Sequence, residues 1–309
     1  MRQLSSALQI VAEAELNEVR SRLETDFQQI RDWFKKQPHL SFEIDDQLLI
    51  SFLRCSKFSL ERTKEKLDYY FTMRSLAPEV FTNRDPLLPE IQAILNAGFM
   101  LPLPKAHGED GSRIVLCRYS DNLDPNTMNF TNLFKVNYML LDILLREDDN
   151  AIVSGIIAWV YYKKMPPKYA VQMTPTDLHK YSMITIKGYP LRHRGTYHTH
   201  LPTLFQVLYD SITVIFPKKT QERSAIFGES NFAKFYDKIP QELLPEEFGG
   251  SNSSVKDLTV FWKQKVESYR DWFLSDEKLK TNEALRPGAP RNGSDIFGVE
   301  GSFRKLNID

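Results

Sequence analysis

The residues best suited to bind a ligand by charge are four cations on either side of one strongly apolar segment, residues 203–215. Arg192 and Arg194 stand two apart in an extended stretch before it. Lys219 and Arg223 stand four apart after it, a spacing that puts both on one face of a helix. Cations that face one another can hold a phosphorylated group, with arginines bonding two phosphate oxygens at once. The alternative is scattered solubilising charge, which the spacing alone does not exclude.

Residues for catalysis are harder to find. The sequence has no phosphate-binding P-loop, no Gly-x-Gly-x-x-Gly after its first strand and no nucleophile elbow. His198 and His200 alternate along a predicted strand, so we expect them to face one way, and such a pair could begin a metal site. No third ligand lies nearby, which favours ordinary strand histidines. We therefore expect no catalytic residue, no cofactor and no metal.

Two predicted helices, residues 131–145 and 203–215, are more apolar than one buried face requires. Core packing is the simpler explanation and is favoured by composition alone. The alternative is that the two helices wall an internal apolar cavity and that one of them can open. An apolar helix that opens beside a phosphate-binding patch is what a protein needs to exchange a ligand at a membrane.

The elements that position these residues change in type along the chain. Residues 1–85 show helical patterns only, with one apolar stripe from Leu16 to Phe34 and a second helix that Asp45 and Asp46 can cap. Beyond them, apolar strands alternate with helices, which indicates βαβ units and a mostly parallel sheet. Residues 287–309 are rich in Gly, Asn, Ser and Pro, and we expect them to be mobile or held only by docking. The predicted strands span residues 113–120, 154–164, 194–200 and 224–228, and the continuous apolar run of 154–164 is typical of a strand covered on both faces.

The charge balance limits the classes of partner. The 40 basic and 40 acidic residues cancel, so no global field draws the protein to nucleic acid, and attraction to a membrane must come from a local patch. No stretch reaches the roughly 20 apolar residues that a membrane span needs. The N-terminus lacks the apolar core of a signal peptide. With only two cysteines, Cys55 and Cys117, the chain is expected to be cytoplasmic.

Three motifs in the sequence resemble those of a known family. Residues 190–223 resemble the signature of the CRAL-TRIO lipid-binding family, which includes tocopherol transfer protein and cellular retinaldehyde-binding protein. The shared features are a Pro-Leu-basic-x-basic-Gly start, a Pro-x-x-Phe turn at Pro202 and Phe205, and a Lys-x-x-x-Arg spacing. LPEEFGG at 244–250 is similar to the closing motif of the family. Residues 45–67 are similar to its N-terminal helical module.

The resemblance implies an α/β fold: an N-terminal helical bundle, then a mixed, mostly parallel five-stranded sheet whose helices enclose an apolar lipid pocket. The implied domains are an N-terminal helical module at 1–85, a CRAL-TRIO lipid-binding domain at 86–260, and a C-terminal helix and mobile tail at 261–309. The helix at 203–215 corresponds to one that opens as a gate in the family.

The resemblance also implies the function. We expect a soluble intracellular carrier, not an enzyme, for a single small hydrophobic lipid of the retinoid, tocopherol or carotenoid type. Arg192, Arg194, Lys219 and Arg223 match the phosphoinositide-binding positions of the tocopherol-transfer branch, so release at a transiently bound membrane is expected. The alternative is a phosphoinositide-binding membrane adaptor without ligand exchange. The expected pocket residues are Phe134, Asn137, Tyr138, Leu141, Ile156, Val160, Ile184, Phe205, Leu208 and Ile212.

Overall fold

The computed structural model describes residues 1–108, 111–172, 174–214 and 216–297; within these ranges the side chains at 170, 171, 208, 211, 212 and 295 are not described. A five-stranded sheet has the order β1-β2-β3-β4-β5. β1 runs antiparallel to β2, and the other neighbours pair in parallel. The four predicted strands and the α/β fold are confirmed, and β1 is added. The strands are β1 (Met100–Pro102), β2 (Arg113–Arg118), β3 (Ile156–Tyr161), β4 (His193–Thr199) and β5 (Ser224–Phe227).

The sheet is covered on both faces, as the continuous apolar strand predicted. Along β3, Ile156 and Val160 join the main hydrophobic core, while Ile157 and Trp159 join a second core on the opposite face. Successive side chains of a strand point to opposite faces, so one apolar strand contributes to both cores.

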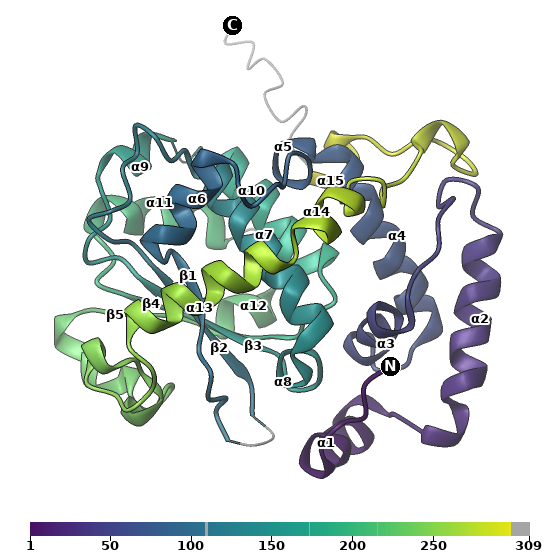
Figure 1. Ribbon diagram of the computed structural model, residues 1–309, viewed down its shortest axis with the longest axis horizontal. Coiled ribbons are helices and arrows are strands. Elements are labelled where there is room, and N and C mark those ends of the chain that lie inside the picture. Colours follow the sequence, from purple (N-terminus) through teal and green to yellow (C-terminus); the bar gives the residue numbers. More distant parts are fainter. Residues whose placement is uncertain (109–110, 173, 215, 298–309) are drawn as a thin grey trace, which may run out of the picture.

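Helices α1 to α4 lie on the right in Figure 1, and α5 and α6 follow them before the sheet begins. The predicted cap at Asp45 is present, since its carboxylate accepts from the backbone N–H of Leu48 at 2.8 Å. The apolar stripe predicted from Leu16 to Phe34 is interrupted, because the first helix ends where Asn17 takes a left-handed conformation with φ 62°. The helices are α1 (Ser6–Leu16), α2 (Leu23–Lys35), α3 (Asp46–Cys55), α4 (Leu60–Leu76) and α5 (Pro78–Phe81), with the 3-10 turn η1 (Arg20–Arg22) before α2.

The remaining helices connect the strands and then return to the N-terminal helices. The green helix α13 crosses in front of the sheet in Figure 1, where the indole N–H of Trp262 donates to the carbonyl of Pro102 at 2.8 Å. Within the described residues no helix is both long and apolar enough to cross a membrane. These helices are α6 (Pro89–Ala97), α7 (Phe130–Glu147), α8 (Asp149–Val153), α9 (Lys168–Gln172), α10 (Pro175–Met183), the π turn η2 (Ile184–Gly188), α11 (Thr203–Thr213), α12 (Lys218–Glu222), the 3-10 turns η3 (Glu229–Phe235), η4 (Gln241–Leu243) and η5 (Glu246–Phe248), α13 (Val255–Ser268), α14 (Arg270–Asp276), η6 (Glu283–Leu285) and α15 (Gly293–Phe297).

The C-terminal segment docks onto the N-terminal helices. The Ser75 hydroxyl donates to the carbonyl of Thr281 at 2.8 Å, and the Arg286 guanidinium pairs with Asp68 at 2.9 Å. Ile296 and Phe297 are buried. Docking therefore holds the start of the predicted tail, while its remainder, 298–309, lies outside the described residues.

Candidate functional site: a basic cleft and an apolar cavity

A cleft of about 1010 Å³ collects the four predicted cations. Residues Arg192 and Arg194 reach it from the start of β4, and Lys219 and Arg223 reach it from α12 and its C-terminal end. Four further cations, which sequence reasoning missed, come from the turn after α3, from α4 and from η2. We call this site the basic cleft, with the cations Lys57, Arg62, Lys66, Lys187, Arg192, Arg194, Lys219 and Arg223.

Backbone contacts fix the orientation of two of these arginines. Arg192 donates from Nη1 to the carbonyl of Val153 at 2.6 Å, and Arg223 donates from Nη1 to the carbonyl of His193. Gly155 lets the chain approach this closely. Its φ is +95°, and a Cβ there would contact the Arg192 carbonyl oxygen and lie 3.0 Å from the Arg194 Cγ. A glycine before β3 therefore helps to shape the cleft.

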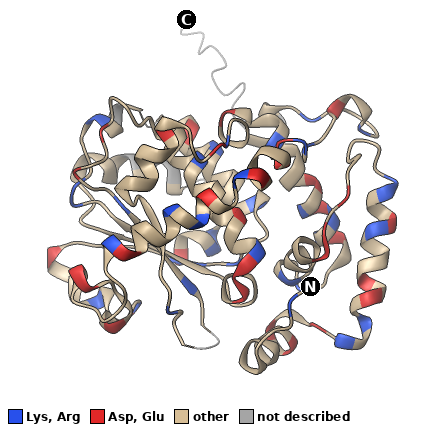
Figure 2. Ribbon diagram, in the orientation of Figure 1, with Lys and Arg blue, Asp and Glu red and all other residues tan. Residues whose placement is uncertain are grey.

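Charge is crowded in the cleft although it is mixed over the rest of the chain, where Figure 2 shows acidic and basic residues interspersed. Burial, together with the positive charge of Arg192, lowers the pKa of Arg194. Burial also lowers the pKa of Lys66, whose ammonium group donates to the carbonyl of Lys187 at 2.9 Å. A bound polyanion would offset the repulsion between Arg192 and Arg194, since it brings an opposite charge close to both.

Next to the basic cleft lies a partly open space of about 230 Å³ between α10, β4, α11 and β5, which we call the apolar cavity. None of the described side chains that line it is Asp, Glu, Lys or Arg. Its apolar lining is Phe134, Leu178, Ile186, Leu201, Phe205 and Phe216, and its polar lining is Tyr162, Ser182, Thr185, His193, Thr196, His198, Tyr209, Thr220 and Ser224.

Both histidines of this cavity are uncharged at neutral pH. Burial lowers the pKa of His198 to about 3, and its Nδ1 shares a hydrogen bond of 3.0 Å with the Tyr162 hydroxyl. Burial, and secondarily the charge of Arg223, lowers the pKa of His193 to about 4; its Nε2 lies 2.6 Å from the Thr196 hydroxyl. The cavity therefore offers neutral hydrogen-bonding groups only.

The expectation that His198 and His200 face one way is wrong. His200 lies beyond the end of β4 with φ 57°, so the alternation of the strand stops before it. Its ring is exposed and contacts Tyr161 and Phe232, away from the cavity that His198 lines. Among the described residues no group of three or more His, Cys, Asp or Glu could hold a metal ion.

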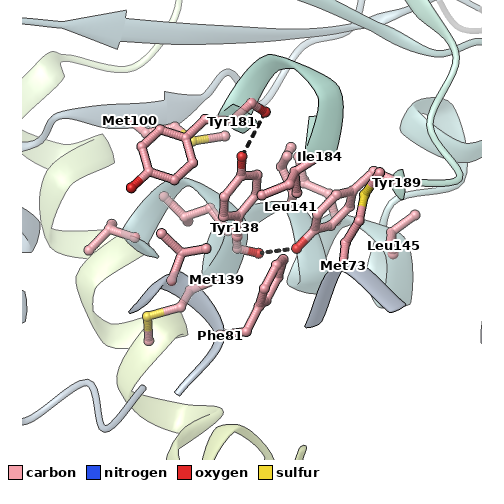
Figure 3. Close-up of a cluster of buried hydrophobic side chains, with 14 of the residues drawn as sticks. Met73, Phe81, Met100, Tyr138, Met139, Leu141, Leu145, Tyr181, Ile184 and Tyr189 are labelled. Carbon is pink, nitrogen blue, oxygen red and sulfur yellow. Dashed lines mark hydrogen bonds between the residues drawn. The ribbon is translucent and has the colours of Figure 1, made fainter. Parts of the chain in front are cut away.

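The structure distributes the predicted pocket residues between the cavity and the core. Phe134 and Phe205 line the apolar cavity. Tyr138, Leu141 and Ile184 lie in the cluster of Figure 3, where the Tyr138 hydroxyl donates to the carbonyl of Tyr181 at 2.9 Å. α7 contacts α5, α6 and α8, so many of its apolar side chains face helices instead of the cavity. Ile156 lies in the main core, and Val160 packs against that core. Asn137 is half-buried. The side chains of Leu208 and Ile212 are not described.

The cavity and the cleft share a wall. Ile186, His193 and Thr220 line both of them. On the outer side of the cavity, α11 buries Phe205 at 4% exposure but leaves Leu204 and Val207 exposed at 59% and 66%. One helix thus closes the cavity and presents apolar side chains to solvent.

The burial of His198 predicts a pH dependence of stability. Its folded pKa lies below the ordinary 6.5, so this group's stabilising contribution is complete above pH 6.5 and is lost as the pH falls toward 3. From pH 6.5 to about pH 5 the free energy of unfolding should fall by about 2 kcal/mol from His198 alone. Urea unfolding at several pH values measures this loss. His198→Gln should flatten the pH dependence and His200→Gln, at the exposed position, should change it much less; equal pH profiles for the two variants would contradict the assignment.

Two segments of the chain match known protein families. Residues 19–91 match the family described as "Pinta-like, UBA domain", and residues 100–250 match "CRAL/TRIO domain". The chain is 29% identical over 252 residues to "Alpha-tocopherol transfer protein-like" of Mus musculus, covering 81% of this chain and 71% of that protein. It is 29% identical over 245 residues to "Clavesin-1" of Rattus norvegicus, covering 78% and 67%. A solved structure titled "Crystal structure of Sfh5" aligns with TM-score 0.49 and 14% identity, covering 86% of this chain and 98% of that chain.

Proposed function

We propose that this chain, whose residues 100–250 match the CRAL/TRIO domain family, carries one small hydrophobic lipid and releases it at membranes that display phosphoinositides. The observation that carries this proposal is the shared wall of Ile186, His193 and Thr220 between the basic cleft and the apolar cavity. A headgroup bound in the cleft would contact the same side chains that close the cavity. Binding of the headgroup and opening of the cavity can therefore be coupled.

The lining of the cavity supports an uncharged ligand. Burying an ionised carboxylate or phosphate without a partner is strongly unfavourable, and the described lining offers no charged partner. Hydroxyl groups such as those of Ser182, Thr185 and Thr196 can instead bond an alcohol or a carbonyl. Retinoids, tocopherols and carotenoids meet this requirement, and we propose a lipid of this type.

The volume supports a moving gate. Ligand sites commonly enclose about 300–1,000 Å³, while the apolar cavity has about 230 Å³ with Phe205 in its wall. We propose that α11 swings outward to admit the lipid. Its exposed side chains Leu204 and Val207 would then enter the apolar layer of the bilayer, as the apolar face of an interfacial helix does.

A single substitution on the outer side of α11 tests this proposal. Val207→Asp places a charge where the helix would enter the bilayer, so binding to phosphoinositide vesicles and transfer of a fluorescent retinoid or tocopherol should each fall about tenfold. Uptake of the same lipid from solution should be unchanged, because Val207 does not line the cavity. The matched control is Val260→Asp at an exposed valine of α13, which should leave vesicle binding intact. An equal loss in both variants would contradict the role of α11.

The modest volume of the cavity also favours a second candidate, a phosphoinositide-binding adaptor that exchanges no ligand. Such a protein would bind vesicles through the basic cleft and keep α11 closed. It would take up none of the lipids offered, which separates it from the carrier.

A further inference from the structure

We propose that Glu15 is a competitor built into the basic cleft, a carboxylate that occupies one phosphate position and weakens every ligand that must displace it, so that only a headgroup with several phosphates binds tightly. This inference rests on the function proposed above. The chemistry it concerns is that of an inositol polyphosphate, whether attached to a lipid or free in solution.

The geometry of Glu15 is that of a bound anion. Its Oε2 accepts from Arg192 Nη2 at 2.7 Å and lies 3.5 Å from Arg194 Nη2. Guanidinium groups hold carboxylate and phosphate oxygens at the same short distances. Two of the four cations expected to bind a headgroup are therefore already paired with an acid from the N-terminal helix α1.

The Glu15 side chain can leave this position without unfolding its helix. It is 44% exposed, and α1 is held elsewhere by a separate small cluster of Leu4, Leu8, Ala12, Leu16 and Val153. The neighbouring acid Glu18 differs, because it forms a fully buried pair with Arg54 at 2.8 Å. Glu18 is a structural residue, whereas Glu15 is a displaceable one.

Competition by Glu15 raises the charge that a ligand must bring. A lipid with one negative charge can do little more than replace the carboxylate, because it gains few contacts that Glu15 did not already make. A headgroup with several phosphates displaces Glu15 and also reaches cations beyond it, such as Lys66, Lys219 and Arg223. Glu15 lowers the affinity of both kinds of ligand by the same factor, and only a headgroup with several phosphates makes enough further contacts to bind tightly in its presence.

The test compares Glu15→Gln with Glu13→Gln, a matched control on the same helix. Glu13 pairs with Arg20 outside the cleft and loses the same charge when it is replaced. Binding is measured to phosphatidylcholine vesicles that contain phosphatidylserine, a phosphatidylinositol monophosphate or a phosphatidylinositol bisphosphate. Glu15→Gln should bind the monophosphate and the bisphosphate about fivefold to tenfold more tightly, by a similar factor for both, and should gain binding to the phosphatidylserine vesicles, for which the wild-type protein has the lowest affinity. Glu13→Gln should match the wild-type protein on all three.

Either of two results would overturn the inference: no gain for Glu15→Gln over Glu13→Gln, or a gain for phosphatidylserine with none for the two phosphoinositides. Calorimetric titration with soluble inositol trisphosphate separates the headgroup from the membrane. Tighter binding by Glu15→Gln is expected there too, and a gain confined to vesicles would contradict competition for phosphate. If Glu15→Gln shows no gain while loss of Arg192 and Arg223 still weakens vesicle binding, the inference fails alone. If none of these variants alters binding, the proposed function fails with it.

Discussion

Replacing Arg192 and Arg223 together with glutamine should lower affinity for phosphoinositide vesicles about 100-fold and leave the affinity for the carried lipid nearly unchanged. Each arginine would supply charge-assisted hydrogen bonds to phosphate, worth about 1.5–3 kcal/mol apiece, and each factor of ten in affinity corresponds to 1.4 kcal/mol. Neither residue lines the apolar cavity. Vesicle flotation and a separate lipid-uptake assay measure the two affinities.

Both of these arginines also donate to backbone carbonyls, those of Val153 and His193, so a loss of local structure could imitate a loss of phosphate binding. A second double variant, Arg194→Gln with Lys219→Gln, avoids those two contacts and should give a loss of similar direction. Two glutamines at Lys263 and Lys265 of α13 remove the same charge far from the cleft and should have little effect. Parallel loss of vesicle binding and lipid uptake in the cleft variants would contradict the separation of the two sites.

Replacing Arg84 with alanine should reduce the free energy of unfolding by about 3–5 kcal/mol, because it leaves buried carboxylates without a full set of partners. Arg84 is 0% exposed; its Nη1 donates to Asp142 at 2.6 Å, and its Nη2 pairs with Asp276. Arg74 reaches the same two carboxylates from α4. This network joins the N-terminal helices to α7 and α14, so its loss should weaken the whole chain.

Urea unfolding measures that loss, and Arg270→Ala is its control. Arg270 pairs with Asp85 at 2.7 Å on the surface, where its side chain is 44% exposed, so its removal should cost much less. The triple variant Arg84→Met, Asp142→Leu and Asp276→Leu would leave the buried Arg74 without a carboxylate partner, so it should not restore stability. Equal destabilisation by Arg84→Ala and Arg270→Ala would show that burial of the network is not what matters.

The fold was largely predictable because the signals for its elements are local. The apolar run at β3 and the cap at Asp45 each depend on neighbours in sequence, and both predictions are confirmed. The break after Leu16 was missed, since the apolar spacing continues through it while the backbone at Asn17 does not.

The cleft was half predictable for the same reason. Arg192, Arg194, Lys219 and Arg223 lie in one short segment, and their spacing places them together. The cations Lys57, Arg62 and Lys66 come from a part of the chain more than a hundred residues earlier, and no local pattern reveals that they share a cleft with it. The weak signal that existed is the four-residue spacing of Arg62 and Lys66 on one helix face.

The cavity was the least predictable part. An apolar helix face looks the same in sequence whether it meets another helix or an empty space, so Phe134 and Tyr138 could not be told apart. The structure separates them, with Phe134 at the cavity and Tyr138 stacked on Tyr189 in the core. The polar lining was missed because Ser182, Thr185 and Thr196 belong to no recognisable sequence motif. Only the fold brings them together at the cavity.

Native mass spectrometry of the purified full chain, followed by organic extraction, tests the central claim most directly. The account predicts one bound uncharged lipid per chain, or uptake of one when retinoids, tocopherols and carotenoids are offered. A protein that remains empty after exposure to all of these lipids, and also to phospholipids, would contradict the carrier function and leave the adaptor.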